Sequence, residues 1–246
     1  MRNLPYITKQ ILTINIVVWL LDSFLLRSGV DLSRYLGLHF VTASQFYIWQ
    51  PFTYMFMHAN LQHIFFNMFA VFMFAPSLEN AWGSKKFLTY YLISGVGAAI
   101  VQEITWAFSL QNELAMFSGE ALAYFTNQFI TIGASGAVFG ILFAFGWLFP
   151  NVEMFIMFIP IPIRARTLVI GYAVIELLAG ISNRAGDNVA HFAHLGGMLF
   201  GWLVILWWKY SWRLKSKNSF RFNQEDDDDR DGRFSNYHYR RNIDDD

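Results

Sequence analysis

The 246-residue sequence contains no cysteine and few charged side chains outside its last forty positions. Without cysteine, the chain forms no disulfide and has no thiolate nucleophile or thiolate metal ligand. Charged residues make up 15% of the chain, whereas hydrophobic residues make up 55% and aromatic residues 19%. This composition is unusual for a soluble domain and favours an integral membrane protein. The first apolar stretch is long and lacks a small-residue cleavage pattern, so we expect it to remain as a membrane span.

Six apolar segments approach the roughly 20 residues that a helix needs to cross a bilayer. They run over 10–26, 61–78, 87–108, 129–149, 167–181 and 189–208. We therefore predict an all-α, polytopic membrane protein built as a bundle of six transmembrane helices over residues 11–208. Residues 1–10 are predicted to form a short cytoplasmic N-terminus. Residues 209–246 lack apolar periodicity and carry runs of aspartate, which predicts a charged, disordered cytoplasmic tail.

Positive charges are distributed unequally between the two sides of this bundle. One side carries Arg2, Lys9, Lys85, Lys86, Arg164, Arg166, Lys209, Arg213, Lys215 and Lys217, and the other only Arg27, Arg34 and Arg184. Lysine and arginine concentrate on the cytoplasmic side of membrane proteins. Both termini are therefore predicted to be cytoplasmic, which agrees with an even number of spans.

A serine and a histidine occupy glycine-rich positions near the starts of two spans. Ser135 lies in the sequence Gly-Ala-Ser-Gly-Ala-Val-Phe-Gly over 133–140, and His194 in Ala-His-Leu-Gly-Gly-Met-Leu-Phe-Gly over 193–201. Polar groups inside a membrane are costly and indicate function. Alone, a serine in a glycine-rich helix is more often a packing residue. The matching histidine favours a nucleophile and its general base.

Glycine spacing indicates how these two residues meet. Gly136 and Gly140 are four residues apart, as are Gly197 and Gly201, and small residues at this spacing let membrane helices approach closely. If the two faces pack together, the hydroxyl of Ser135 lies at hydrogen-bond distance from His194. The second, fourth and sixth spans enter the membrane from one side, so their first thirds share one depth.

The second span supplies further polar side chains at that depth. His63 and Asn67 are four residues apart and therefore lie on one helix face. Opposite Ser135, they would stabilise an oxyanion together with the Ser135 backbone N–H; alone, they would more often be interhelical hydrogen-bonding residues. His58 is closer to the surface and would position water or the first external loop. Since neither Asp22 nor Asp187 is suitably placed to complete a triad, a Ser–His dyad is the simpler hypothesis.

These three motifs, in this order on alternate spans, resemble the rhomboid family of intramembrane serine proteases. The resemblance covers about 11–208 and implies a rhomboid-like bundle that cleaves single-span membrane proteins within or near their transmembrane segment. It implies Ser135 as nucleophile and His194 as base, with His63, Asn67 and the Ser135 amide as the oxyanion hole. It implies supporting roles for a larger set: His58, Gly133, Gly136, Phe139, Gly197 and Gly201. Neither cofactor, metal nor nucleic acid is expected; the partners are substrates and the lipid bilayer.

The resemblance also implies that the fifth span and residues 182–189 form a substrate gate and cap. Three positions depart from the family pattern. Phe139 stands where a tyrosine is common, Gln50 follows Trp49 where arginine is common, and the segment 79–83 lacks a middle arginine. The last two changes put the anchoring of the loops in question, while the catalytic residues are retained.

Two alternative functions remain open at this point. A catalytically inactive relative would bind membrane clients without cleaving them, although the presence of both Ser135 and His194 argues against it. A haem- or metal-binding membrane protein would use histidines on different spans, such as His63 and His194, as ligands. For His191, a structural and an auxiliary role are equally supported. The compact form and short N-terminus suggest a bacterial inner membrane, with the site opening to the periplasmic side.

Overall fold

The computed structural model describes residues 4–155, 162–182 and 189–228. Its contacts divide the chain into two units, Met1–Ile205 and Leu206–Asp246. Residues 209–228 continue a helix, whereas the sequence predicted a tail without regular structure from 209 onward. The remainder of that predicted tail, 229–246, lies outside the described residues. All further description concerns the first unit.

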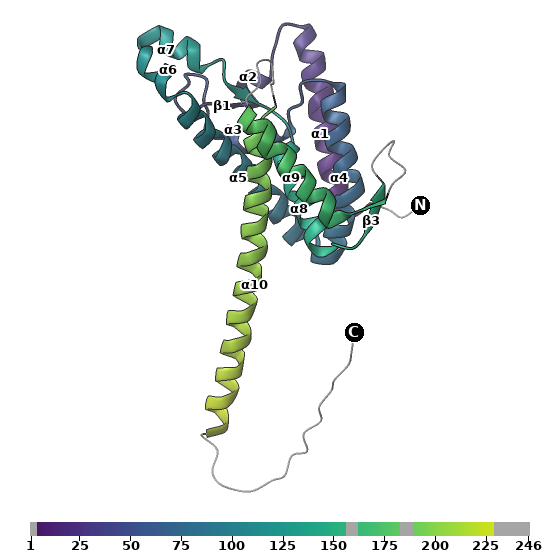
Figure 1. Ribbon diagram of the computed structural model, residues 1–246. Coiled ribbons are helices and arrows are strands. Elements are labelled where there is room, and N and C mark those ends of the chain that lie inside the picture. Colours follow the sequence, from purple (N-terminus) through teal and green to yellow (C-terminus); the bar gives the residue numbers. More distant parts are fainter. Residues whose placement is uncertain (1–3, 156–161, 183–188, 229–246) are drawn as a thin grey trace. The chain divides into compact units, whose positions relative to one another are not determined.

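Six helices correspond to the six predicted spans (Figure 1). They are α1 (Tyr6–Arg27), α4 (Leu61–Trp82), α5 (Ser84–Ser109), α8 (Ser135–Leu148), α9 (Ala165–Ser182) and α10 (His191–Asp228). Five of them are long and apolar enough to cross a membrane, the last through its segment His191–Ser211. The exception is α8, which has 14 residues. The predicted all-α, polytopic fold is confirmed.

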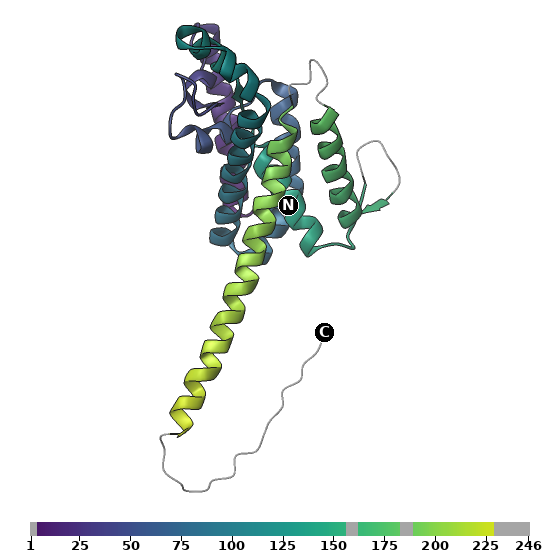
Figure 2. The ribbon, with the colours of Figure 1, turned by 60° about the vertical axis from the view of Figure 1, so that its left-hand side comes forward.

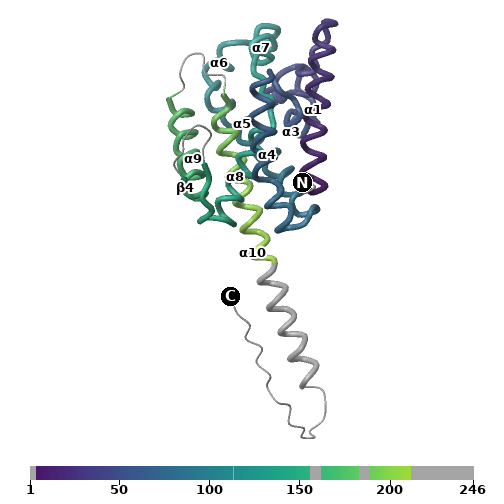
Figure 3. The backbone as a smooth tube through the Cα atoms, turned by 90° about the vertical axis from the view of Figure 1, so that its right-hand side faces the viewer, coloured from purple at the N-terminus to yellow at the C-terminus, as the bar shows by residue number. Residues whose placement is uncertain are grey.

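Helix α8 lies at the centre of the first unit and packs against α4, α5 and α9. Helices α1 and α9 lie at opposite edges, with α4, α5 and α8 between them (Figures 2 and 3). Small side chains let α8 occupy this position, because a methyl group built on Gly136 would lie 2.4 Å from Ala98 Cβ of α5. Nine of the fourteen α8 residues are buried, so this helix forms the core against which the site is built.

One carboxylate fixes three helix ends. Glu79, near the end of α4, accepts hydrogen bonds from the backbone N–H groups of Ile7 and Thr8 at 2.9 and 2.7 Å, and from the Thr8 hydroxyl at 2.8 Å. The hydroxyl of Ser84 donates to it at 2.6 Å. The first N–H groups of α1 have no partners inside the helix, and this carboxylate satisfies two of them. The N-terminal ends of α1 and α5 therefore meet the C-terminal end of α4 at one side of the unit.

The connection between α1 and α4 is anchored by a buried glutamine. It contains α2 (Ser33–Leu36), β1 (Leu38–His39), α3 (Gln50–Thr53) and the 3-10 helix η1 (Tyr54–Phe56). The side chain of Gln50 donates to the Gln45 carbonyl at 2.8 Å and accepts from the His39 N–H at 3.2 Å. Trp49 Nε1 donates to the Tyr35 carbonyl at 2.9 Å. Gln50 thus holds the loop from a position where the family often has arginine.

The fourth apolar segment does not begin as a helix. Residues 130–131 form β2 (Ile130–Thr131), which pairs antiparallel with β1, Leu38 opposite Thr131. The prediction of a span from 129 was therefore wrong for its first six residues, because the strand hydrogen bonds compete successfully with the helix. The long connection before it contains α6 (Gln111–Met116) and α7 (Gly119–Thr126). Between α8 and α9 lies the hairpin of β3 (Glu153–Phe155) and β4 (Pro162–Arg164).

Candidate active site

Ser135 is the first residue of α8, and the glycine two residues before it has a positive φ. Gly133 has φ +131°, a value that side chains rarely allow, and its N–H donates to the Tyr54 carbonyl at 2.9 Å. A methyl group on Gly133 would lie 2.7 Å from His63 Nε2 and 3.7 Å from Ser135 Oγ. Glycine is therefore required by both the backbone and the space between these two side chains.

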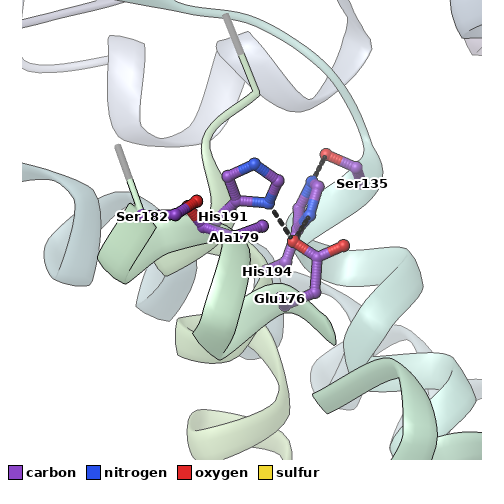
Figure 4. Close-up of polar contacts among 6 residues, drawn as sticks. All are labelled: Ser135, Glu176, Ala179, Ser182, His191 and His194. Carbon is purple, nitrogen blue, oxygen red and sulfur yellow. Dashed lines mark hydrogen bonds and ion pairs between the residues drawn. The ribbon is translucent and has the colours of Figure 1, made fainter. Parts of the chain in front are cut away.

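The serine hydroxyl and the histidine ring meet across two helices (Figure 4). Ser135 Oγ lies 2.8 Å from Nε2 of His194, which is in the first turn of α10. The ring of Phe139 stacks on His194 with a centroid distance of 4.3 Å and an interplanar angle of 10°. Phe139 is one turn beyond Ser135, so α8 supplies both the hydroxyl and the surface that orients the imidazole.

A glutamate that was not predicted from the sequence lies on the other side of His194 from Ser135. Glu176, on α9, places Oε2 2.9 Å from His194 Nδ1 and 2.6 Å from His191 Nδ1. All three side chains are largely buried, with exposed fractions of 10% for His194, 11% for Glu176 and 14% for His191. Figure 4 shows both rings directed at the carboxylate and Ser135 beyond His194. An acid in a helical span, 18 residues before the histidine, was the available signal.

The carboxylate determines which histidine nitrogen carries the proton. An ionised carboxylate only accepts hydrogen bonds, so each imidazole donates its Nδ1–H to Glu176. In the neutral imidazole of His194, Nε2 then carries the lone pair and accepts the proton of the Ser135 hydroxyl. The side chains of Glu176, His194 and Ser135 therefore form a continuous hydrogen-bonded chain that can remove a proton from serine.

The predicted oxyanion residues lie on α4 beside this chain. The ring of His63, in the first turn of α4, borders Gly133, which lies two residues before Ser135. The amide of Asn67 donates one hydrogen bond to the His63 carbonyl at 3.1 Å, and its side chain is buried. The ring of His58 packs edge-on against that of His63, with centroids 5.0 Å apart. Burial and the neighbouring His63 ring lower the pKa of His58 to about 3, so this ring is neutral.

The predicted glycine faces meet most closely at one point. A methyl group built on Gly197 would lie 1.8 Å from the carbonyl oxygen of Gly136, so α8 and α10 touch backbone to backbone here. Gly140 also faces α10, since a methyl group on it would lie 3.2 Å from the Gly197 carbonyl oxygen. Helix α5 packs against the same glycines, with Ser94 beside Gly140 and Tyr90 beside Gly201. Glycine contacts on both partners therefore set the distance from Ser135 to His194.

Helix α8 is shorter than a bilayer core. Its fourteen residues span roughly 21 Å, whereas a bilayer core is about 30 Å thick. A cleft of about 1080 Å³ reaches towards the site, lined by His191 and Phe192, by Thr105 and Trp106 of α5, and by Gln128. The lining combines polar and apolar side chains, and His191 belongs both to this cleft and to the cluster around Glu176.

Several predicted features lie outside the described residues. Asp187, Arg184 and most of the expected cap, 183–188, are among them. The gate helix predicted over 167–181 corresponds to α9, which carries Glu176.

Comparisons with known proteins agree with the motifs. Residues 45–210 match the Rhomboid domain. The chain is 31% identical over 159 residues to Rhomboid protease AarA of Providencia stuartii, covering 61% of this chain and 52% of that protein. It is 30% identical over 158 residues to Putative rhomboid protease YdcA of Bacillus subtilis, covering 63% and 65%. It is 30% identical over 159 residues to the mitochondrial Rhomboid protein 1 of Saccharomyces cerevisiae, covering 61% and 40%. The aligned part of the chain thus spans between two fifths and two thirds of the length of these relatives.

Proposed function

The chain belongs to the rhomboid family, and we propose that it is a serine endopeptidase that cleaves membrane proteins within the bilayer. The observation that carries this proposal is the 2.8 Å contact between Ser135 Oγ and His194 Nε2. The proposal is further supported by relatives named as rhomboid proteases.

In the proposed reaction, Ser135 Oγ attacks the carbonyl carbon of the scissile peptide bond. His194 Nε2 takes the hydroxyl proton as the new C–O bond forms, and returns it to the departing amine as the C–N bond breaks. The acyl-enzyme is then hydrolysed by water, which the same nitrogen deprotonates. Glu176 acts through His194 as a positioning residue, because its carboxylate holds Nδ1–H and stabilises the imidazolium that forms transiently.

The negative oxygen of the tetrahedral intermediate needs donors near Ser135. The first N–H groups of α8 have no partners inside the helix. They lie at the positive end of the helix dipole, which favours a nearby anion. The ring of His63, beside Gly133, is assigned as a second donor. The remaining N–H of Asn67 is assigned as a third. Losing one such donor typically reduces kcat about 100- to 1000-fold.

The substrates proposed are single-span membrane proteins, which reach the site laterally past α9. A helical substrate must unwind locally, because its carbonyl groups are already hydrogen-bonded along the helix. Both termini are assigned to the cytoplasm of a bacterial cell, with the site open to the periplasmic side. The charge bias supports this orientation, since Lys9, Lys85 and Lys86 lie near the helix ends that Glu79 joins. Relatives occur in bacteria, mitochondria and chloroplasts.

The test is covalent labelling of the purified protein in detergent by a fluorophosphonate probe. Wild type should be labelled, and mass spectrometry should locate the adduct on Ser135. Ser135→Ala and His194→Ala should not be labelled, although each variant remains folded by thermal unfolding. Folded wild-type protein that resists labelling would contradict the proposal and favour a client-binding relative.

A further inference from the structure

A second chemical property is present in the cluster that orients the catalytic base. Glu176 Oε2, His191 Nδ1 and His194 Nδ1 all lie within 4.8 Å of one another. Two of these three ligand atoms come from adjacent turns at the start of α10, at positions i and i+3, and the third comes from α9. In the tautomer that carries its proton on Nε2, each imidazole offers a lone pair on Nδ1 to a metal ion, as the carboxylate oxygen also does. Figure 4 shows both rings directed at that oxygen.

The donor set suits one class of cation. Two imidazole nitrogens and one carboxylate oxygen are the ligands of Zn²⁺ in many three-residue sites, in which a fourth position stays open to water. At Zn–ligand distances of about 2.0–2.1 Å, tetrahedral ligands lie about 3.3 Å apart. The two nitrogens are at present 2.6 and 2.9 Å from the oxygen, so movements of less than an ångström would admit the ion.

An ion has a route to this position. His191 lines the cleft of about 1080 Å³ that also contacts Gln128 and Thr131. The three side chains are largely buried, and that of His191 is the most exposed. An ion in the cleft would therefore meet His191 first.

We propose that Glu176, His191 and His194 form a site for Zn²⁺ or a similar transition-metal ion, and that its occupancy switches the protease off. This proposal rests on the proposed function, because it concerns the regulation of the same base. It differs from a catalytic metal centre, since the ion would occupy the nitrogen of His194 that faces away from Ser135.

The inhibition follows from the two nitrogens of one ring. Without metal, neutral His194 carries its proton on Nδ1 and offers Nε2 to Ser135. For a metal to bind at Nδ1, the ring must adopt its other neutral tautomer, in which the proton is on Nε2 and the lone pair is on Nδ1; the number of protons on the ring is unchanged. Nε2–H can then only donate a hydrogen bond to Ser135 Oγ and cannot accept its proton. The metal also takes Glu176 out of its hydrogen bond to His194.

The first experiment measures cleavage of a single-span substrate by the purified full-length protein across a Zn²⁺ titration, with Mg²⁺ as the control ion. Saturating Zn²⁺ should abolish cleavage, EDTA should restore it, and Mg²⁺ should have no effect. In His191→Ala, scaled to its own metal-free rate, the midpoint of inhibition should rise at least about tenfold. His58→Asn tests the neighbouring His58–His63 pair as the alternative target. Inhibition that His58→Asn relieves and His191→Ala does not would overturn the assignment.

A second experiment separates this proposal from the proposed function. Equilibrium binding of Zn²⁺ is measured on Ser135→Ala, which needs no activity. If Ser135→Ala binds Zn²⁺ and Ser135→Ala/His191→Ala does not, the metal site is supported. This result holds even if wild type fails to cleave substrate and the proposed function is refuted. If wild type cleaves substrate at the same rate with and without Zn²⁺, and Ser135→Ala binds no Zn²⁺, the metal site is refuted. The protease assignment is then unaffected.

Discussion

The carboxylate of Glu176 provides a quantitative test of how the base is oriented. Glu176→Ala removes the acceptor of the 2.9 Å hydrogen bond from His194 Nδ1 and leaves this ring free to rotate or to change tautomer. A hydrogen bond to a charged group contributes about 1.5–3 kcal/mol. If this energy is needed in the transition state, kcat falls roughly 10- to 150-fold. KM should change little, because Glu176 is assigned to act on His194 rather than on the substrate.

Glu176→Gln divides that effect into charge and geometry. The amide oxygen can still accept Nδ1–H, but the negative charge that stabilises the imidazolium is lost. Hydrogen bonds to a charged group are about twice as strong as neutral ones, so about half of that energy is lost and kcat should fall roughly 4- to 13-fold. His191→Ala is the matched control, since it removes the other donor to the same oxygen at 2.6 Å and leaves the hydrogen bond from His194 Nδ1 to Glu176 in place. Its loss in kcat should be smaller than that of Glu176→Ala.

The assay is cleavage of a fluorogenic single-span substrate in detergent, with kcat and KM determined separately. Thermal unfolding of each variant gives the folded fraction, which corrects the rates for any loss of stability. A merely structural role would lower the folded fraction and leave the corrected kcat at the wild-type value. Glu176→Ala with wild-type kcat per folded molecule would refute the positioning role and restore a simple Ser–His dyad.

Three further variants test the packing and the pH response. Gly197→Ala should lower the unfolding temperature, because its methyl would lie 1.8 Å from the Gly136 carbonyl oxygen, and overpacking typically costs about 1–3 kcal/mol. Gly171→Ala has no neighbouring atom within 4 Å and should instead stabilise the fold by about 0.5–1 kcal/mol. Equal effects of the two would contradict the close helix contact. His58 is neutral in the fold with its pKa lowered to about 3, so its stabilising contribution is complete above pH 6.5 and is lost as the pH falls towards 3. Thermal unfolding of wild type against pH should show this loss, and His58→Asn should show a shallower slope; parallel slopes would exclude it. Gln50→Ala should destabilise the connection between α1 and α4 by about 1–3 kcal/mol for each buried group left unpaired, measured as faster proteolysis of that connection. Unchanged proteolysis would argue against the anchoring role of Gln50.

Apolar length and glycine spacing were enough to predict the main architecture. The six helices follow the six apolar segments, because each must satisfy its own backbone hydrogen bonds in lipid. Spacing of four residues correctly indicated where α8 and α10 would touch, at Gly136 and Gly197. It did not indicate that α5 would also pack against Gly140 and Gly201, because a small residue allows a close contact without defining its partner.

Local extended structure and the third polar residue were not predicted. The apolar run from 129 continues smoothly into α8, and only pairing with the distant Leu38 and His39 makes its first part a strand. Similarly, Glu176 is a lone acid in an apolar stretch, and its role depends on the position of α9 beside α10. Sequence spacing within one helix carries no information about such contacts between helices. Sequence motifs correctly pointed to Ser135 and His194 as neighbours because both motifs include the glycines that bring them together.

The most direct test of the central claim is proteolysis in a membrane. Wild type and Ser135→Ala are each reconstituted in liposomes with a single-span substrate, and the products are identified by mass spectrometry. The account predicts one or a few cuts within or beside the substrate's transmembrane segment by wild type, and intact substrate with Ser135→Ala. Intact substrate with folded wild type, or the same cuts with Ser135→Ala, would contradict it.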